Sequence, residues 1–170
     1  MEDVGLVGYL RFVTEEQSAS VRGALFIING RGEPVDFSFS RVGIQASFLW
    51  RSGEAHRHAV RTLCASLFSS CAKEPSLLLA RAEEVPPLLL SEDLEVKVPT
   101  ARVSSDSSPT HAVSEIQEDL PGELHMYWVN SVPQPDSQAR QLVNLLVGRG
   151  LFLEPFDRAA QGIDVAFTTQ

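Results

Sequence analysis

The chain has 170 residues, of which 44% are hydrophobic, so it is long enough for a folded domain and too apolar to be disordered throughout. Two cysteines are too few for a disulfide framework, no apolar run approaches the roughly 20 residues that span a bilayer, and the first residues lack a signal-peptide pattern, so we expect a cytoplasmic protein without membrane contact. The formal net charge of −8 arises from residues 62–170, and this acidity disfavours non-specific binding to nucleic acid.

Three runs of strand-forming residues occupy the first quarter of the chain. Residues 6–13 are apolar on both faces of a two-residue repeat, which is typical of a strand buried on both sides. Residues 21–28 form the second run, and Asn29-Gly30 after it supplies the positive φ angles of a tight hairpin. With the third run, at 34–40, the pattern predicts an antiparallel meander of three strands.

The third run alternates between apolar and polar side chains. Phe37 and Phe39 fall on one face of the predicted strand, and Asp36 and Ser38 fall on the other. This pattern predicts that one face meets the core and the other meets water.

From Gly53 the spacing of apolar residues changes to that of an α-helix. We expect this helix to end near Lys73, before Pro75, and to be followed by strands at 76–80 and 94–103. The apolar stripe of the predicted helix consists of Val60, Leu63, Cys64, Leu67, Phe68 and Cys71.

The last third of the chain is expected to contain further regular structure. A strand is predicted at 124–129, followed by a helix that Asp136 or Ser137 can cap. Two further short strands are predicted at 151–156 and 163–169.

Together these elements predict an α+β (mixed α/β) fold. An N-terminal antiparallel β-meander packs against a helix, and a C-terminal β-α-β-type segment completes the sheet or covers it. We expect residues 1–103 to form the main core, the acidic, serine-rich residues 104–122 to form a linker or a long loop, and residues 123–170 to pack on the core or on a partner.

The predicted helix carries the locally basic surface of this acidic chain. Arg57 and Arg61 lie one turn apart, and Arg51 precedes them. Such a face could bind a phosphate backbone or an acidic protein, or could simply pair with nearby carboxylates. His56 and His58 diverge by about 200° on a helix, so we expect no metal ion held by both.

Aromatic side chains suggest a second possible contact surface. They could cover the exposed side of the N-terminal sheet, or they could form an interface, because Tyr and Trp are enriched at interface cores. The candidate partner-binding residues are Trp50, Arg51, Arg57, Arg61, Tyr127 and Trp128.

Asp36, with Glu83 or Glu84, is the acidic set that could serve a metal-dependent enzyme. Strand alternation already explains the polar side chain at position 36, which weakens this interpretation. The sequence contains no nucleophile motif and no phosphate-binding glycine loop. We therefore expect no catalytic residue, metal or cofactor.

These observations favour a non-catalytic protein-interaction or accessory subunit of an intracellular assembly, partnered by another protein or by a second copy of itself. Two alternatives remain open. One is a metal-dependent nuclease or phosphoesterase that uses Asp36 with nearby carboxylates. The other is a nucleic-acid-associated module that uses the Arg51, Arg57 and Arg61 face, which the overall acidity makes less favoured than a protein partner.

Overall fold

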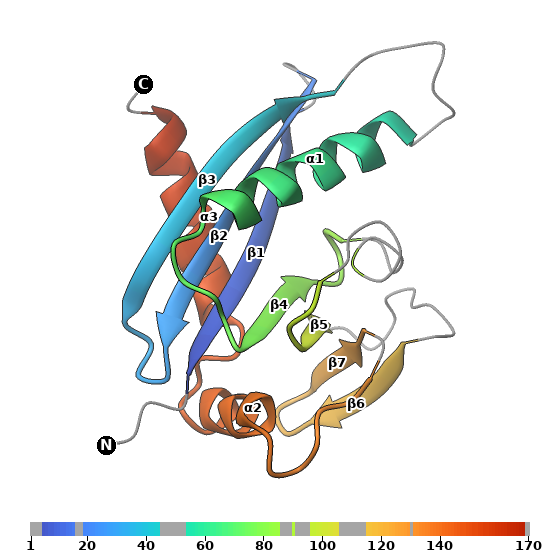
Figure 1. Cartoon of the computed structure of the whole chain (residues 1–170), viewed down its shortest axis with the longest axis vertical. Helices are drawn as coiled ribbons and strands as arrows, with labels where there is room; N and C mark the ends of the chain where they lie inside the picture. The colour runs from blue at the N-terminus through green and yellow to red at the C-terminus, as the bar shows by residue number, and fades with distance from the viewer. Residues whose placement is uncertain are drawn as a thin grey trace.

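The protein contains one mixed sheet with helices on both faces (Figure 1). In the described residues the sheet has seven strands, in the order β3-β2-β1-β4-β5-β7-β6. The predicted mixed α/β class is confirmed. The computed structural model describes residues 5–15, 19–44, 54–85, 90, 96–105, 115–129 and 131–168.

The N-terminal strands form the antiparallel meander that the sequence predicts. These strands are β1 (Leu6–Glu15), β2 (Ser20–Asn29) and β3 (Pro34–Gly43). The turn between β2 and β3 depends on Asn29, whose side-chain oxygen accepts two backbone N–H bonds of 3.0 Å each. The positive φ angle of this turn, +84°, occurs at Gly32, where the absence of Cβ relieves the strain.

A helical crossover then extends the sheet from β1 in the other direction. Helix α1 (Glu54–Ser70) leads to β4 (Leu77–Arg81), which pairs in parallel with β1. Strand β5 (Thr100–Ser104) pairs in parallel with β4. The predicted strand at 94–103 therefore begins later than expected, because residues 96–99 lie outside it.

A second hairpin lies at the far edge of the sheet. It consists of β6 (Ile116–Leu120) and β7 (Leu124–Trp128), which pair antiparallel. Strand β6 lies within the range predicted as a linker, because its polar side chains occupy an exposed edge and give no apolar repeat. Gly122 and Glu123 both have positive φ in the tight turn between the strands.

Two helices follow the hairpin. Helix α2 (Gln138–Gly148) begins after Ser137, whose hydroxyl caps the helix by accepting from the backbone N–H of Arg140. Helix α3 (Glu154–Thr168) occupies the region in which two short strands were predicted, so that prediction is wrong. None of the described helices is both long and apolar enough to cross a membrane.

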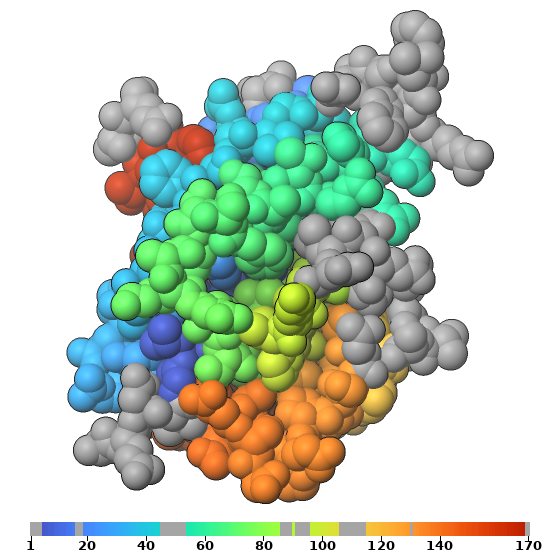
Figure 2. Space-filling view, in the orientation of Figure 1, coloured from blue at the N-terminus to red at the C-terminus, as the bar shows by residue number. Residues whose placement is uncertain are grey.

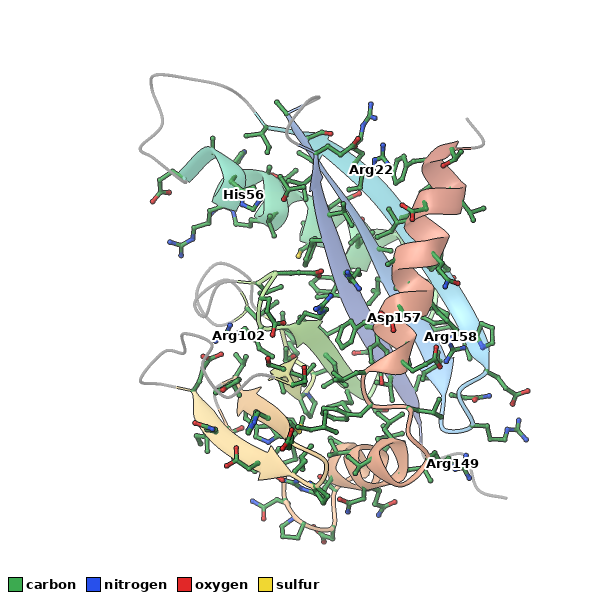
Figure 3. The ribbon with its side chains drawn as sticks, turned by 180° about the vertical axis from the view of Figure 1, so that it is seen from behind. Arg22, His56, Arg102, Arg149, Asp157 and Arg158 are labelled. Atoms are coloured by element: carbon green, nitrogen blue, oxygen red, sulfur yellow. The ribbon has the colours of Figure 1, made fainter. Side chains whose placement is uncertain are left out.

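The helices create two cores, one on each face of the sheet. Helix α1 packs on one face, whereas α2 and α3 pack on the other; in Figure 3, α3 is seen on the face opposite α1. Because α1 covers the polar face of β3, Ser38 is buried, with 9% of its surface exposed. On the opposite face Phe39 is 43% exposed near the sheet edge. The prediction that one face of β3 meets water is therefore wrong, because α1 covers the polar face and Phe37 packs against the core on the face of α3.

Candidate functional site

The parallel strands β1, β4 and β5 end at the same edge of the sheet. In open α/β sheets, ligands bind in the crevice outside the carboxyl ends of the strands. Four charged side chains, here called the strand-end cluster, meet at this edge. They are Arg11 on β1, Arg81 at the end of β4, and Glu83 and Glu84 in the turn that follows β4.

Ion pairs connect the members of the strand-end cluster. Nε of Arg11 lies 2.6 Å from Oε2 of Glu84, and Nη1 of Arg81 lies 3.6 Å from the same oxygen. Nε of Arg81 also lies 3.8 Å from Oε2 of Glu83, whose other oxygen accepts from the hydroxyl of Ser104 on β5. Two guanidinium groups and two carboxylates are thereby held together by three strands.

Glu84 is the member of the cluster whose pKa is shifted by its surroundings. Burial raises the pKa of its carboxyl above the usual value, against the opposing effects of the backbone N–H of Phe12 and the charges of Arg11 and Arg81. That N–H donates to Oε1 of Glu84 at 3.0 Å. A carboxyl whose pKa is shifted towards neutrality beside fixed cations is a common feature of sites that transfer protons.

Arg11 is incompletely satisfied at this position. Its Nη1 donates to the backbone carbonyl of Phe156 at 3.2 Å, which ties β1 to α3. Nε is near Glu84, but its N–H is not aligned for a hydrogen bond, and it is the buried side-chain nitrogen without a hydrogen-bond partner in the described part of the chain. The charge of Arg11 is therefore held between the carboxylate of Glu84 and a backbone carbonyl of α3.

Arg102 holds the turn that carries the two glutamates. Its Nη1 donates to the carbonyls of Ala82 at 3.2 Å and Val85 at 3.0 Å, which bracket Glu83 and Glu84. The same guanidinium donates twice to Glu115, at 2.9 Å and 2.8 Å, and both side chains are 1% exposed. The position of the glutamate pair is therefore fixed from within the core.

The basic surface predicted on the first helix lies next to the same edge. Arg57, His58 and Arg61, here called the basic face of α1, lie within about 100° of one another around the N-terminal half of the helix, whereas His56 diverges from His58 by about 200°. Nε2 of His56 lies 3.0 Å from the hydroxyl of Thr14, near the carboxyl end of β1. In Figure 3, His56 lies on the side of the molecule towards which β4 points. The basic face and the strand-end cluster therefore both lie towards the carboxyl ends of β1 and β4, but on different faces of the sheet, because Arg11 contacts α3 whereas α1 covers the other face.

Asp36, by contrast, lies away from the other predicted carboxylates. The strand register places Asp36 opposite Ile27, level with the start of β1 and the start of β4. Its Oδ2 accepts from the backbone N–H of Ala72 at 3.2 Å and lies 3.6 Å from Sγ of Cys71. The acidic set of Asp36 with Glu83 or Glu84 is therefore not assembled.

Among the described residues, neither the strand-end cluster nor the surroundings of Asp36 provide a set of ligands that fits a metal ion. Nowhere in the described ranges do three or more His, Cys, Asp or Glu side chains gather as a metal site would require. In the strand-end cluster the two carboxylates face arginines, which compete with a cation for the same oxygens.

The predicted aromatic contact residues divide into two groups. Tyr127 is 1% exposed and Trp128 is fully buried, so both belong to the core and cannot form a partner-binding surface. Trp128 also donates from Nε1 to Glu118 at 2.9 Å. Trp50 and Arg51 lie outside the described residues.

Sequence reasoning missed Arg11, Arg81 and Arg102. One signal was available, because Arg11 and Arg102 each interrupt an apolar strand, where a charge needs a buried partner. The convergence of three separate strands was not visible in the sequence.

Comparison with known proteins identifies the fold. No family model and no curated protein matches the chain. Among solved structures, endonuclease V from Streptomyces avermitilis is similar with a TM-score of 0.62 and 13% identity, over 97% of this chain and 82% of that one. Endonuclease V from Bacillus subtilis follows with a TM-score of 0.56 and 13% identity, over 96% and 81% of the two chains.

A third similar structure contains nucleic acid. It is endonuclease V from Ciona intestinalis, with a D234N substitution, in complex with a 23mer DNA containing an inosine followed by a ribo-adenosine. The TM-score is 0.55 and the identity is 10%, over 96% of this chain and 86% of that one. At these identities the likeness demonstrates a shared fold.

These comparisons correct the favoured prediction. A non-catalytic accessory subunit dedicated to protein-protein interaction and complex assembly is contradicted, because the solved proteins that share this fold are endonucleases. The nuclease alternative agrees better with them as a class of protein, although its central residue, Asp36, lies away from Glu83 and Glu84.

Proposed function

We propose that this protein is a nuclease that binds nucleic acid at the strand-end cluster and cleaves the phosphodiester backbone there. The observation that carries the proposal is the convergence of Arg11, Arg81 and Glu84 at the carboxyl ends of parallel strands. The shared fold with three endonuclease V structures, one of them bound to DNA, supports the same class of substrate.

The two arginines suit a phosphodiester substrate. A guanidinium presents a planar set of donors that matches phosphate oxygens, and its charge stabilises the negative charge that develops on phosphorus-bound oxygens during cleavage. Arg11 is paired with Glu84, and Arg81 is the more exposed of the two arginines, with 36% of its side chain accessible. Arg81 is the better placed of the two to meet the substrate first.

Glu84 is assigned the role of general base. Once the arginines pair with phosphate, its carboxylate can accept a proton from an attacking water. The water oxygen then bonds to phosphorus, the bond from phosphorus to the leaving oxygen breaks, and the leaving oxygen takes a proton from solvent. The raised pKa of Glu84 brings its proton affinity closer to that needed near neutral pH.

The basic face of α1 extends the proposed binding surface. Arg57 and Arg61 lie one turn apart on the helix whose His56 contacts the end of β1. They are suited to contact backbone phosphates on either side of the cleaved one, a role that fixes position without reading sequence.

The test measures binding and cleavage separately. Fluorescently labelled DNA and RNA oligonucleotides are titrated by polarisation, and their cleavage is followed on denaturing gels with and without Mg²⁺. We expect Arg81→Met to weaken binding about tenfold and Glu84→Gln to slow cleavage at least about a hundredfold while binding is retained.

Matched controls come from the far end of the meander. Arg31→Met and Glu33→Gln make the same charge changes in the turn between β2 and β3, where the two side chains pair with each other. Circular dichroism confirms folding of each variant. Equal losses in Arg31→Met and Arg81→Met, or intact oligonucleotides under all conditions, would count against the proposal.

A further inference from the structure

A separate cavity of about 430 Å³ lies at the amino ends of β4 and β5, on the face covered by α1. Figure 2 shows it as a hollow between the green segment that follows α1 and the yellow-green segment that precedes β5. Its apolar lining includes Leu25 on β2, Leu78 on β4, Phe68 on α1, and Val96 and Val98 before β5. The size is ordinary for a small-molecule site.

Both lysines of the chain lie at this cavity. The sequence contains two lysines, Lys73 and Lys97, and each lines the hollow with an exposed side chain. Within the described ranges neither ammonium group forms an ion pair. Glu74 also lines the cavity, so its wall carries a positive excess in a chain of net charge −8.

A thiol at the cavity wall and a carboxylate directly beside it are the nearest other polar groups. Cys71 lines the cavity, and burial raises the pKa of its thiol, which is therefore neutral near pH 7. Asp36 is not part of the lining, but its Oδ2 accepts from the backbone N–H of Ala72 and lies 3.6 Å from Sγ of Cys71, and both of these residues line the cavity. Counted with Asp36, two carboxylates balance the two lysines, so binding of an anion here depends on the exposed ammonium groups of Lys73 and Lys97 and not on the net charge of the wall.

We propose that this cavity binds a small amphipathic carboxylate. The apolar body of the ligand lies on Leu25, Phe68 and Leu78, and its carboxylate pairs with the ammonium groups of Lys73 and Lys97. The cavity and the strand-end cluster lie at opposite ends of β4, so this site does not depend on the proposed nuclease function.

Octanoate and its neutral counterpart 1-octanol are the probes. Isothermal titration calorimetry on the full chain is expected to show one octanoate bound per molecule, with 1-octanol binding much more weakly. Lys73→Met and Lys97→Met are each expected to weaken octanoate binding about fivefold, as for the loss of one partly exposed ion pair. Val98→Phe is expected to abolish binding by filling the cavity.

Two further variants separate this site from the rest of the molecule. Arg31→Met removes one positive charge far from the cavity, and Arg81→Met alters the strand-end cluster; both are expected to bind octanoate as the wild type does. The proposal is overturned if octanoate gives no heat of binding, if 1-octanol binds as tightly, or if Lys73→Met and Lys97→Met leave the affinity unchanged.

Discussion

Arg102 illustrates how a single buried charge can organise several segments. Its guanidinium connects β5 to the turn after β4 and to Glu115 just before β6, and it lies over the ring of Tyr127 at 5.7 Å. A buried ion pair adds little net stability over an apolar pair of similar size, but removing one partner leaves the other charge unpaired in the core. We infer that this pair specifies position more than it adds stability.

Arg102→Met is therefore expected to destabilise the fold by about 3–5 kcal/mol, because Glu115 remains buried without its partner. Urea denaturation at pH 7 measures the loss. The double variant Arg102→Met/Glu115→Met removes both charges and is expected to recover a substantial part of it. A single-variant loss below about 1 kcal/mol would contradict this account.

Glu118 provides a prediction about pH. Two hydrogen bonds from Arg140, at 2.6 Å and 2.8 Å, lower the pKa of its carboxyl below the usual 4.5, and the bond from Trp128 acts in the same direction. A depressed pKa in the folded state stabilises the protein above the unfolded-state pKa, and this stability is lost as the pH falls through the folded-state pKa.

Glu118→Gln is thus expected to lower stability by about 1–2 kcal/mol at pH 7, and the difference from wild type is expected to shrink as the pH falls below 4.5. Denaturant unfolding between pH 3 and pH 7 measures this difference. Glu123→Gln, in the exposed turn of the same hairpin, serves as the control and should show no comparable change. A pH-independent loss in Glu118→Gln would contradict the electrostatic explanation.

At the scale of elements, the sequence predicted α1 and α2 well and α3 poorly. Residues 151–156 and 163–169 contain enough β-branched and aromatic side chains to resemble two strands. The helix is instead determined by the spacing of Phe156, Ala159 and Ile163, which fall on one buried face against the sheet. Tertiary burial overrides local propensity here.

The contact between α3 and β3 requires a residue without a side chain. A Cβ placed on Gly162 would lie 2.6 Å from the ring of Phe37, whereas one on Gly148 in α2 would meet nothing within 4 Å. Gly162→Ala is expected to destabilise the protein by about 1–2 kcal/mol, because overpacking exceeds the gain in helix propensity. Gly148→Ala, the matched control, should be neutral or stabilising. Thermal unfolding measures both changes, and stabilisation of Gly162→Ala would show that the ring of Phe37 yields easily.

At the scale of the whole molecule, local pairings were predictable and distant ones were not. The meander of β1, β2 and β3 follows from consecutive strands joined by short turns. The parallel pairing of β1 with β4 depends on a long crossover, and it brings Arg11 next to Glu84. The strand-end cluster could not be predicted for that reason, whereas the basic face of α1 could be read from its own helical spacing.

The number of cations that contact phosphates determines how nucleic acid binding should respond to salt. With Arg11, Arg81, Arg57 and Arg61 as the contacting cations, about four phosphates are neutralised, which corresponds to a loss of about a hundredfold in affinity for double-stranded DNA between 50 mM and 200 mM salt. Polarisation titrations over this range give the slope, and Arg61→Met should reduce it by about one unit. A slope near zero would be incompatible with backbone binding.

The order of the strands in the sheet also predicts which strands open most readily and which open least. Strand β1 is bonded to β2 along its length and to β4 from Val7 to Leu10, and both of its faces lie under helices, while β3 and β6 form the two margins of the sheet. Amide protons at the centre should therefore exchange with deuterium last, after those of β3 and β6 have already exchanged. Because Arg11 directly follows this doubly bonded stretch of β1, the proposed phosphate site is attached to the part of the molecule that opens least often.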